Sequence, residues 1–380
     1  MENKISLYIH IPFCKSKCYY CDFASYANKE ESMEDYVLAL VNEMRNYGEL
    51  FKNNKIATVF IGGGTPTILP LKLLKKVLKN IFVNFNIENN AEITIEANPG
   101  TLNHDNLSLL KEFGVNRLSI GLQAYQNNLL KKIGRIHTVE EFIKNFLLAR
   151  KLGFNNINID LMFALPNQTL KDWIVTLKEI TKLNPEHISC YSLTIEENTP
   201  FGLLEKEGKL KKADEEIDRK MYHYAQKYLS TKEYIQYEIS NFSKLEFESK
   251  HNLTYWTYKP YIGIGLGAHS FLEGKRYHNT YNLSKYIKSN GEINKLKEDI
   301  EVLSPKMQYA EYIFLGLRLL KGIDVTEFYN QFKISFDELF KEKVHKLINL
   351  GLLEKNKENI RLTHKGIDLS NIVFSEFLPE

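Results

Sequence analysis

The sequence predicts an α/β fold built on a parallel sheet, followed by a small helical module. Short apolar, β-branched runs alternate with longer stretches of helical periodicity, which is the pattern of repeated βα units. The length of 380 residues suits two or possibly three domains. Six strands joined by crossover helices can form an open doubly wound sheet or a curved partial barrel, and periodicity does not choose between them.

The expected strands are the short apolar runs at residues 6–11, 57–62, 92–97, 117–122, 156–162 and 187–193. The expected helices are the longer periodic stretches near residues 31–50, 70–83, 103–113, 138–152 and 169–183. Loops that follow the carboxyl ends of parallel strands face one side, where such folds place their sites. The chemistry-bearing motifs of this chain sit in those loops or at those strand ends.

Beyond residue 200 the pattern changes to a polar, helix-leaning stretch and then to an aromatic region at 251–271. Helical patterns near 306–320, 325–331 and 336–351 precede two short strands and a last helix, an order similar to a winged helix. Such modules often bind DNA, but no basic concentration marks the expected recognition helix, so a packing or lid role is favoured. The predicted division is a barrel at 1–240, a connecting region at 241–300 and a C-terminal module at 301–380.

Composition restricts the partners and the compartment. Fifty basic and 47 acidic residues leave a net charge of +3, which does not predict nucleic acid or an anionic membrane as the main partner. A hydrophobic fraction of 43% excludes a wholly disordered or fibrous chain. No run reaches the roughly 18 apolar residues of a membrane span, and the start lacks the apolar core of a signal peptide. We therefore expect a cytoplasmic protein without a transmembrane segment.

Three of the four cysteines fall within eight positions, with the spacing C-x3-C-x2-C at Cys14, Cys18 and Cys21. In a long cytosolic chain such a cluster indicates metal binding or catalysis. A structural zinc site would need a fourth ligand, and His10 and Asp22 lack the usual paired spacing. A cubane iron-sulfur cluster can be held by three cysteines, so it is favoured, with zinc as the alternative.

The string "CKSKCYYC" resembles the signature of radical S-adenosylmethionine (SAM) proteins. The longer strings "LYIHIPFCKSKCYYCDF", "FIGGGTPT", "EANPG", "SIGLQAY", "GRIH" and "DLMFALP" resemble those of oxygen-independent coproporphyrinogen III oxidases and their relatives. The resemblance covers most of the chain. It implies a radical SAM partial (β/α)6 TIM-like barrel with a winged-helix-like C-terminal module, and a [4Fe-4S] cluster on the three cysteines whose open iron binds SAM.

The resemblance also implies which residues contact SAM. They are Tyr8, Tyr20, Gly63, Gly64, Thr65, Glu96, Gln123, Arg135 and Asp160. From the residues alone, "GGGTPT" lacks the features of a phosphate loop and could be a simple turn. Carboxylates at the ends of central strands need hydrogen-bond donors, which ribose hydroxyls, a ligand ammonium or Arg135 in a structural ion pair could each supply.

The string "HNLTYW" groups an imidazole, an amide and two aromatic rings at His251, Asn252, Tyr255 and Trp256. The residues alone favour a satisfied histidine beside an aromatic core patch. In the family that the chain resembles, this string marks the heme chaperone branch and is linked to heme binding. His269 and His137 are possible secondary ligands, although polar structural roles are simpler. Cys190 is most simply a buried thiol.

One position departs from the porphyrinogen oxidases, which carry a further cysteine two residues after the third cluster ligand. Here that position is Phe23, and Cys14 lies almost at the start of the sequence, whereas those enzymes have an N-terminal extension before the cluster cysteines. Both features follow the heme chaperone branch. The resemblance therefore implies a heme chaperone that delivers heme to an acceptor such as a respiratory cytochrome, with a homodimer among its expected partners. The alternative is an oxygen-independent coproporphyrinogen III oxidase that abstracts hydrogen from propionate side chains.

Overall fold

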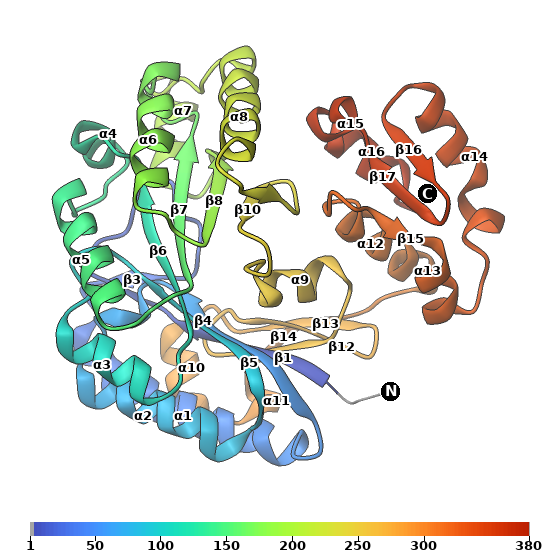
Figure 1. Ribbon diagram of the computed structural model, residues 1–380. Helices are drawn as coiled ribbons and strands as arrows, with labels where there is room; N and C mark the ends of the chain where they lie inside the picture. The colour runs from blue at the N-terminus through green and yellow to red at the C-terminus, as the bar shows by residue number, and fades with distance from the viewer. Residues whose placement is uncertain (1–3, 380) are drawn as a thin grey trace.

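The computed structural model describes residues 4–379 and is organised around one open 12-stranded sheet (Figure 1). Its six central strands are parallel to one another: β1 (Lys4–Ile11), β4 (Lys55–Gly63), β5 (Asn86–Ala97), β6 (Arg117–Gln123), β7 (Ile157–Phe163) and β8 (His187–Ser192). Each corresponds to a predicted strand. The outermost strands of the sheet do not pair with each other, so it forms a TIM-like partial barrel.

Helices follow the central strands and complete the βα units (Figure 1). They are α1 (Met33–Leu50), α2 (Leu71–Asn84), α3 (His104–Glu112), α4 (Asn127–Lys132), α5 (Val139–Lys151) and α6 (Leu170–Lys182), with 3-10 turns η1 (Glu30–Ser32) and η2 (Pro66–Ile68). Capping boxes start α3, α5 and α6, where the side chains of Asn103, Thr138 and Thr169 accept from backbone N–H groups. These local signals fix where each helix begins.

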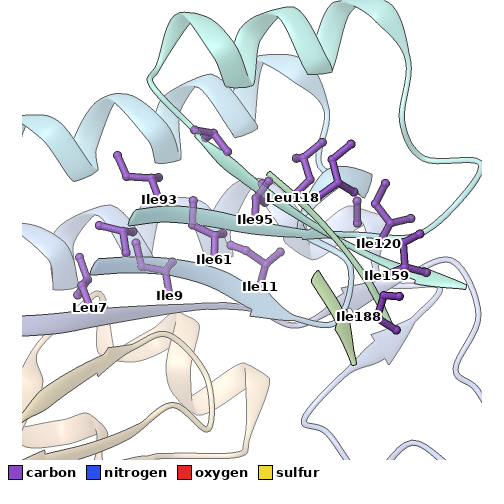
Figure 2. Close-up of a cluster of buried hydrophobic side chains, with 14 of the residues drawn as sticks. Leu7, Ile9, Ile11, Ile61, Ile93, Ile95, Leu118, Ile120, Ile159 and Ile188 are labelled. Carbon is purple, nitrogen blue, oxygen red and sulfur yellow. The ribbon is translucent and has the colours of Figure 1, made fainter. Parts of the chain in front are cut away.

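Branched aliphatic side chains of the central strands form the core, and Figure 2 shows them gathered in one cluster. Leu7, Ile9 and Ile11 of β1 are completely buried, as are Ile61 of β4 and Ile95 of β5. Every residue of β6 is buried, because this strand lies in the middle of the parallel run. Each buried Ile or Leu contributes roughly 1.5–3 kcal/mol, so the core holds the strand ends in a fixed arrangement.

The second half of the chain extends the sheet at both ends. Beyond β8, helices α7 (Pro200–Lys206) and α8 (Glu215–Ser230) lead to β9 (Ile235–Gln236) and β10 (Asn241–Ser243). After α9 (Lys250–Trp256), β11 (Tyr261–Ile264) pairs in parallel with β1. The sheet continues through β12 (His269–Leu272), β13 (Lys275–Asn279) and β14 (Lys297–Val302), and α10 (Leu283–Ser289) and α11 (Ile293–Leu296) connect the last two strands. Segments some 250 residues apart in sequence are thereby neighbours.

The C-terminal module stands beside the barrel (Figure 1). It consists of α12 (Pro305–Gly316), β15 (Ile323–Asp324), α13 (Val325–Phe332), α14 (Phe336–Asn349), β16 (Leu353–Asn356), β17 (Asn359–Leu362), α15 (His364–Asp368) and α16 (Ser370–Glu376). The single last helix predicted from the sequence divides at Leu369 into two short helices. Throughout residues 4–379, no helix is long and apolar enough to cross a membrane.

Candidate functional site

The cysteine loop follows β1 and is closed by a short parallel pair, β2 (Phe13–Cys14) and β3 (Tyr26–Ala27). Cys14, Cys18 and Cys21 are partly exposed free thiols. They line one cavity of about 350 Å³. Within residues 4–379, no three His, Cys, Asp or Glu side chains are arranged closely enough to hold a metal ion as they stand. The loop nevertheless supplies three thiol donors that line the same cavity, which is the number of donors that a cluster held by three cysteines requires.

The same cavity collects most of the side chains that the resemblance assigns to SAM. Besides the cysteines, its lining includes Tyr20, Gly63, Gly64, Glu96, Gln123, Arg135 and Asp160. Thr65 lies just behind it, with its Oγ1 3.6 Å from the Cys14 Sγ. Tyr8 lines the neighbouring cavity instead. Residues from several strands and loops, far apart in the sequence, thus meet in one place.

The "GGGTPT" loop packs tightly against the start of the cysteine loop. The Gly63 N–H donates to Glu96 Oε2 at 3.0 Å, while the N–H groups of Gly64 and Thr65 donate to backbone carbonyls. A Cβ on Gly64 would lie 2.6 Å from the Phe13 carbonyl oxygen and 3.0 Å from the Cys14 Sγ. These amides are therefore occupied. A ligand ammonium only donates hydrogen bonds, so on this loop it would meet oxygen acceptors and not the N–H groups.

Two carboxyl groups face the cavity in different environments. Glu96 lies at the end of β5, where burial and then the charge of Asp160 raise its pKa to about 8. Asp160, predicted at the end of its strand, lies in the middle of β7. There it accepts from Ser119 Oγ at 2.8 Å and from Asn158 Nδ2 at 2.9 Å. Glu96 can thus hold a proton near neutral pH, and the Asp160 carboxylate is fixed in place by the two hydrogen bonds that it accepts.

Arg135 connects the cavity to the cysteine loop. Its guanidinium donates to Cys18 Sγ at 3.5 Å, to Asn98 Oδ1 at 2.8 Å and to the Gly121 carbonyl oxygen. Among residues 4–379 no salt bridge joins Arg135 to Glu96 or Asp160, although the charge of Asp160 helps to raise the pKa of the guanidinium after burial, Tyr20 and Cys18 have acted on it. Its Nε is buried and has no hydrogen-bond partner among residues 4–379.

A second, larger cavity of about 820 Å³ adjoins the first and shares Tyr20, Cys21, Gly63 and Glu96 with it. Its wall includes His251, Asn252 and Tyr255 of α9. His251 is only 1% exposed. Its Nδ1 is 2.7 Å from Thr58 Oγ1 and its Nε2 is 2.8 Å from Tyr255 Oη, and burial lowers its pKa to about 3. The ring is therefore neutral, with both nitrogens engaged.

Trp256 lies apart from the other residues of its motif. It lines neither of the two cavities, and the Cζ of Arg318 lies 4.3 Å from the centre of its ring. The Trp256 Nε1 is buried and has no hydrogen-bond partner. Of the two secondary histidines, His269 lines the large cavity, whereas His137 does not. Of the motif residues, His251, Asn252 and Tyr255 thus line the large cavity, whereas Trp256 packs against Arg318 outside it.

Sequence reasoning missed two residues that build the site, Glu92 and Asn98, and considered a third, His10, only as a zinc ligand. Glu92 starts α9 by accepting from the backbone N–H groups of Lys250 and His251 at 3.1 and 3.0 Å. Asn98 bridges Thr65 and Arg135, and only its place directly after the Glu96 strand end could have indicated this. His10 donates from Nε2 to the Ala24 carbonyl oxygen at 2.7 Å, so its Nδ1 accepts from Tyr8 Oη.

Comparisons with known proteins agree with this architecture. The Radical SAM superfamily matches residues 8–180, and the HemN C-terminal domain matches residues 303–369. A protein named heme chaperone HemW from Lactococcus lactis is 40% identical over 378 residues, which cover 100% of this chain and 98% of that protein. The chain belongs to the HemW family of radical SAM proteins.

Other relatives with the HemW name extend the match. The protein from Bacillus subtilis is 40% identical over 99% of both chains, and the one from Escherichia coli is 34% identical over 99% of this chain and 98% of its own. A solved structure of the Escherichia coli coproporphyrinogen III oxidase HemN superposes with a TM-score of 0.86. It covers 99% of this chain and 90% of that chain at 24% identity, which shows a shared fold.

Proposed function

We propose that this HemW-family protein is a heme chaperone that binds heme in the 820 Å³ cavity and delivers it to an acceptor protein, such as a respiratory cytochrome. The observation that carries the proposal is the position of the "HNLTYW" helix: His251, Asn252 and Tyr255 line a large aromatic cavity that adjoins the cysteine loop. The volume lies within the roughly 300–1,000 Å³ of typical ligand pockets. Curated relatives across the full length carry the heme chaperone name.

Cys14, Cys18 and Cys21 are the proposed ligands of a [4Fe-4S] cluster, which supplies an open iron position for SAM when it is bound. The protein's own contribution is positioning. Arg135 donates a hydrogen bond to Cys18 Sγ, and hydrogen bonds to cluster sulfurs tune such centres. Glu96, Gln123 and Asp160, which line the same cavity, would provide acceptors for the ammonium and hydroxyl groups of SAM.

For heme, the aromatic side chains of the large cavity offer an apolar enclosure. Tyr8, Phe60 and His251 form a layer of rings, with Phe60 stacked on His251 at a centroid distance of 5.1 Å. A porphyrin plane packs well against such faces. His251 Nε2 becomes available to iron when the Tyr255 hydroxyl releases it. Phe23 extends from the cysteine loop into the lining of both cavities and is 67% exposed.

Coproporphyrinogen III oxidation is the competing activity, because the oxidase HemN shares the fold. Phe23 stands where the oxidases carry an additional cysteine, and function resides in the site rather than in the fold. An anaerobic assay with reductant, SAM and coproporphyrinogen III separates the two activities. Efficient formation of protoporphyrinogen would overturn the proposal of a chaperone alone.

A heme titration of the anaerobically reconstituted protein tests the proposal itself. We expect one heme to bind per chain and then to move to an apo-cytochrome supplied as acceptor. His251→Ala should weaken heme binding by about tenfold while the iron-sulfur absorbance is retained. His104→Ala is the matched control, because His104 lies on α3 with its side chain 70% exposed. An unchanged Soret titration for His251→Ala would remove His251 from the heme site.

A further inference from the structure

A histidine at the edge of the large cavity is better placed to meet iron than His251. His269, the first residue of β12, lines the same cavity and is exposed. Its Nε2 lies 2.9 Å from Tyr281 Oη. Its Nδ1 makes no hydrogen bond within residues 4–379. Among the cavity-lining imidazoles, this ring combines exposure to solvent with an uncommitted nitrogen.

The other two histidines of the cavity are committed to the protein. His10 uses Nδ1 for Tyr8 and Nε2 for the Ala24 carbonyl, and His251 uses its nitrogens for Thr58 and Tyr255. His278, directly opposite His269 in the β12–β13 ladder, is also bonded at both nitrogens. Any ligand that needs an imidazole lone pair therefore meets His269 first.

The surroundings of His269 match those of a metal-binding imidazole. Histidine ligands generally bond through their second nitrogen to a partner that fixes the ring, and Tyr281 Oη is in that position. The backbone of Tyr281 is itself held, because Tyr26 Oη of β3 donates to its carbonyl oxygen at 2.8 Å. The side of the ring that faces the protein is desolvated, and this, followed by the neighbouring His278, lowers the pKa of His269, which favours the neutral form that has a lone pair to donate.

We propose that His269 is an axial ligand of the heme iron at the mouth of the large cavity. The proposal rests on the heme chaperone function proposed above. It adds an iron ligand, because the Nε2 of His251 is hydrogen-bonded to the Tyr255 hydroxyl and does not offer a lone pair. Heme delivery is then a ligand exchange without oxidation or reduction. The bond from iron to His269 Nδ1 breaks as an imidazole of the acceptor protein takes its place. An exposed ligand suits this exchange, because the acceptor can approach it.

The test uses the full-length reconstituted protein with ferric heme as the probe. We expect His269→Ala to bind heme at least about tenfold more weakly and to lose the low-spin imidazole signature in electron paramagnetic resonance. Added free imidazole should restore that signature. Tyr281→Phe, which removes the hydroxyl at Nε2, should weaken binding severalfold. His104→Ala should behave as wild type, and circular dichroism verifies folding.

The outcomes separate the two proposals. Wild-type affinity and spectrum in His269→Ala would overturn the ligand assignment. If His251→Ala loses heme while His269→Ala retains it, the chaperone function stands and the assignment of His269 falls. If the wild-type chain binds no heme at all, the proposed function itself fails, and the His269 assignment fails with it.

Discussion

The two adjoining cavities differ in how the chain builds them. The 350 Å³ cavity is lined by thiols, carboxyl groups and a guanidinium that come from loops and strands within residues 14–191. The 820 Å³ cavity is lined mainly by aromatic rings and imidazoles, and its walls join β1 and β4 to α9, β12 and the segment around Tyr281. The first depends on the order of the βα units, and the second depends on β11 returning beside β1. The polar cavity is thus built by the first half of the chain, whereas the aromatic cavity needs residues from both halves.

The cavities also share a wall, which links whatever the two of them hold. The shared residues are Tyr20, Cys21, Phe23, Gly63, Glu96, Met162 and Tyr191. A substitution in this wall should affect both sites, whereas one on an outer wall should affect only one.

The largest effect should come from the cysteine loop. Cys18→Ser removes a thiolate donor, and we expect near-complete loss of iron and sulfide after anaerobic reconstitution. Metal analysis and the absorbance of the cluster measure this. Cys190→Ala is the control, because Cys190 is buried in β8 and lines neither cavity. One bound zinc without iron or sulfide in the wild-type chain would contradict the cluster.

Gly64→Ala should disturb the cysteine loop without replacing any of the three cysteines. The added Cβ would meet the Phe13 carbonyl oxygen and the Cys14 Sγ at 2.6 and 3.0 Å, so the loop must shift. We expect a loss of about 1–3 kcal/mol in urea unfolding together with poor cluster loading. Gly153→Ala has open space but a φ of +83°, so it should cost stability and leave loading unchanged. If Gly64→Ala and Gly153→Ala loaded the cluster equally well, the close contact of Gly64 with the cysteine loop would be contradicted.

Glu96→Gln should change the pH dependence of stability. The folded carboxyl, with a pKa of about 8, holds its proton above the unfolded pKa of about 4.3, so wild-type stability falls as pH rises between these values. Glutamine does not titrate and can still accept from the Gly63 N–H. Between pH about 5 and about 9, we expect the free energy of unfolding of the variant to rise by about 1–3 kcal/mol relative to that of the wild type. Solvent in the cavity keeps the difference at this size. If the free energies of unfolding of wild type and variant changed with pH in the same way, the raised pKa of the buried Glu96 carboxyl would be contradicted.

Trp256→Phe should have the smallest effect on the heme site. Because Trp256 packs under Arg318 outside both cavities, the heme Kd should stay within about twofold of wild type. The loss of the cation–π contact should cost about 1 kcal/mol in urea unfolding. A tenfold loss of heme affinity would place Trp256 in the site and would contradict the division of the motif.

The central strands were predictable because they depend on short-range patterns. Short apolar runs located all six strands, and the strand ends brought Glu96 and Gln123 to one cavity with the cysteines, whereas Arg135, in the loop after α4, was assigned only through the family resemblance. The second cavity was not predictable from such patterns. The parallel pairing of β11 with β1 joins residues about 255 positions apart, and no local signal encodes it. For the same reason, the sequence could not separate His269 from an ordinary polar histidine.

Simultaneous binding of SAM and heme tests the account of two sites most directly. The reconstituted wild-type protein would be saturated with SAM and then titrated with heme, with both ligands quantified after gel filtration. We predict that one molecule of each is retained per chain and that SAM changes the heme Kd by less than about tenfold, since the cavities share a wall without coinciding. Displacement of SAM by one equivalent of heme would show a single shared site and would contradict the account.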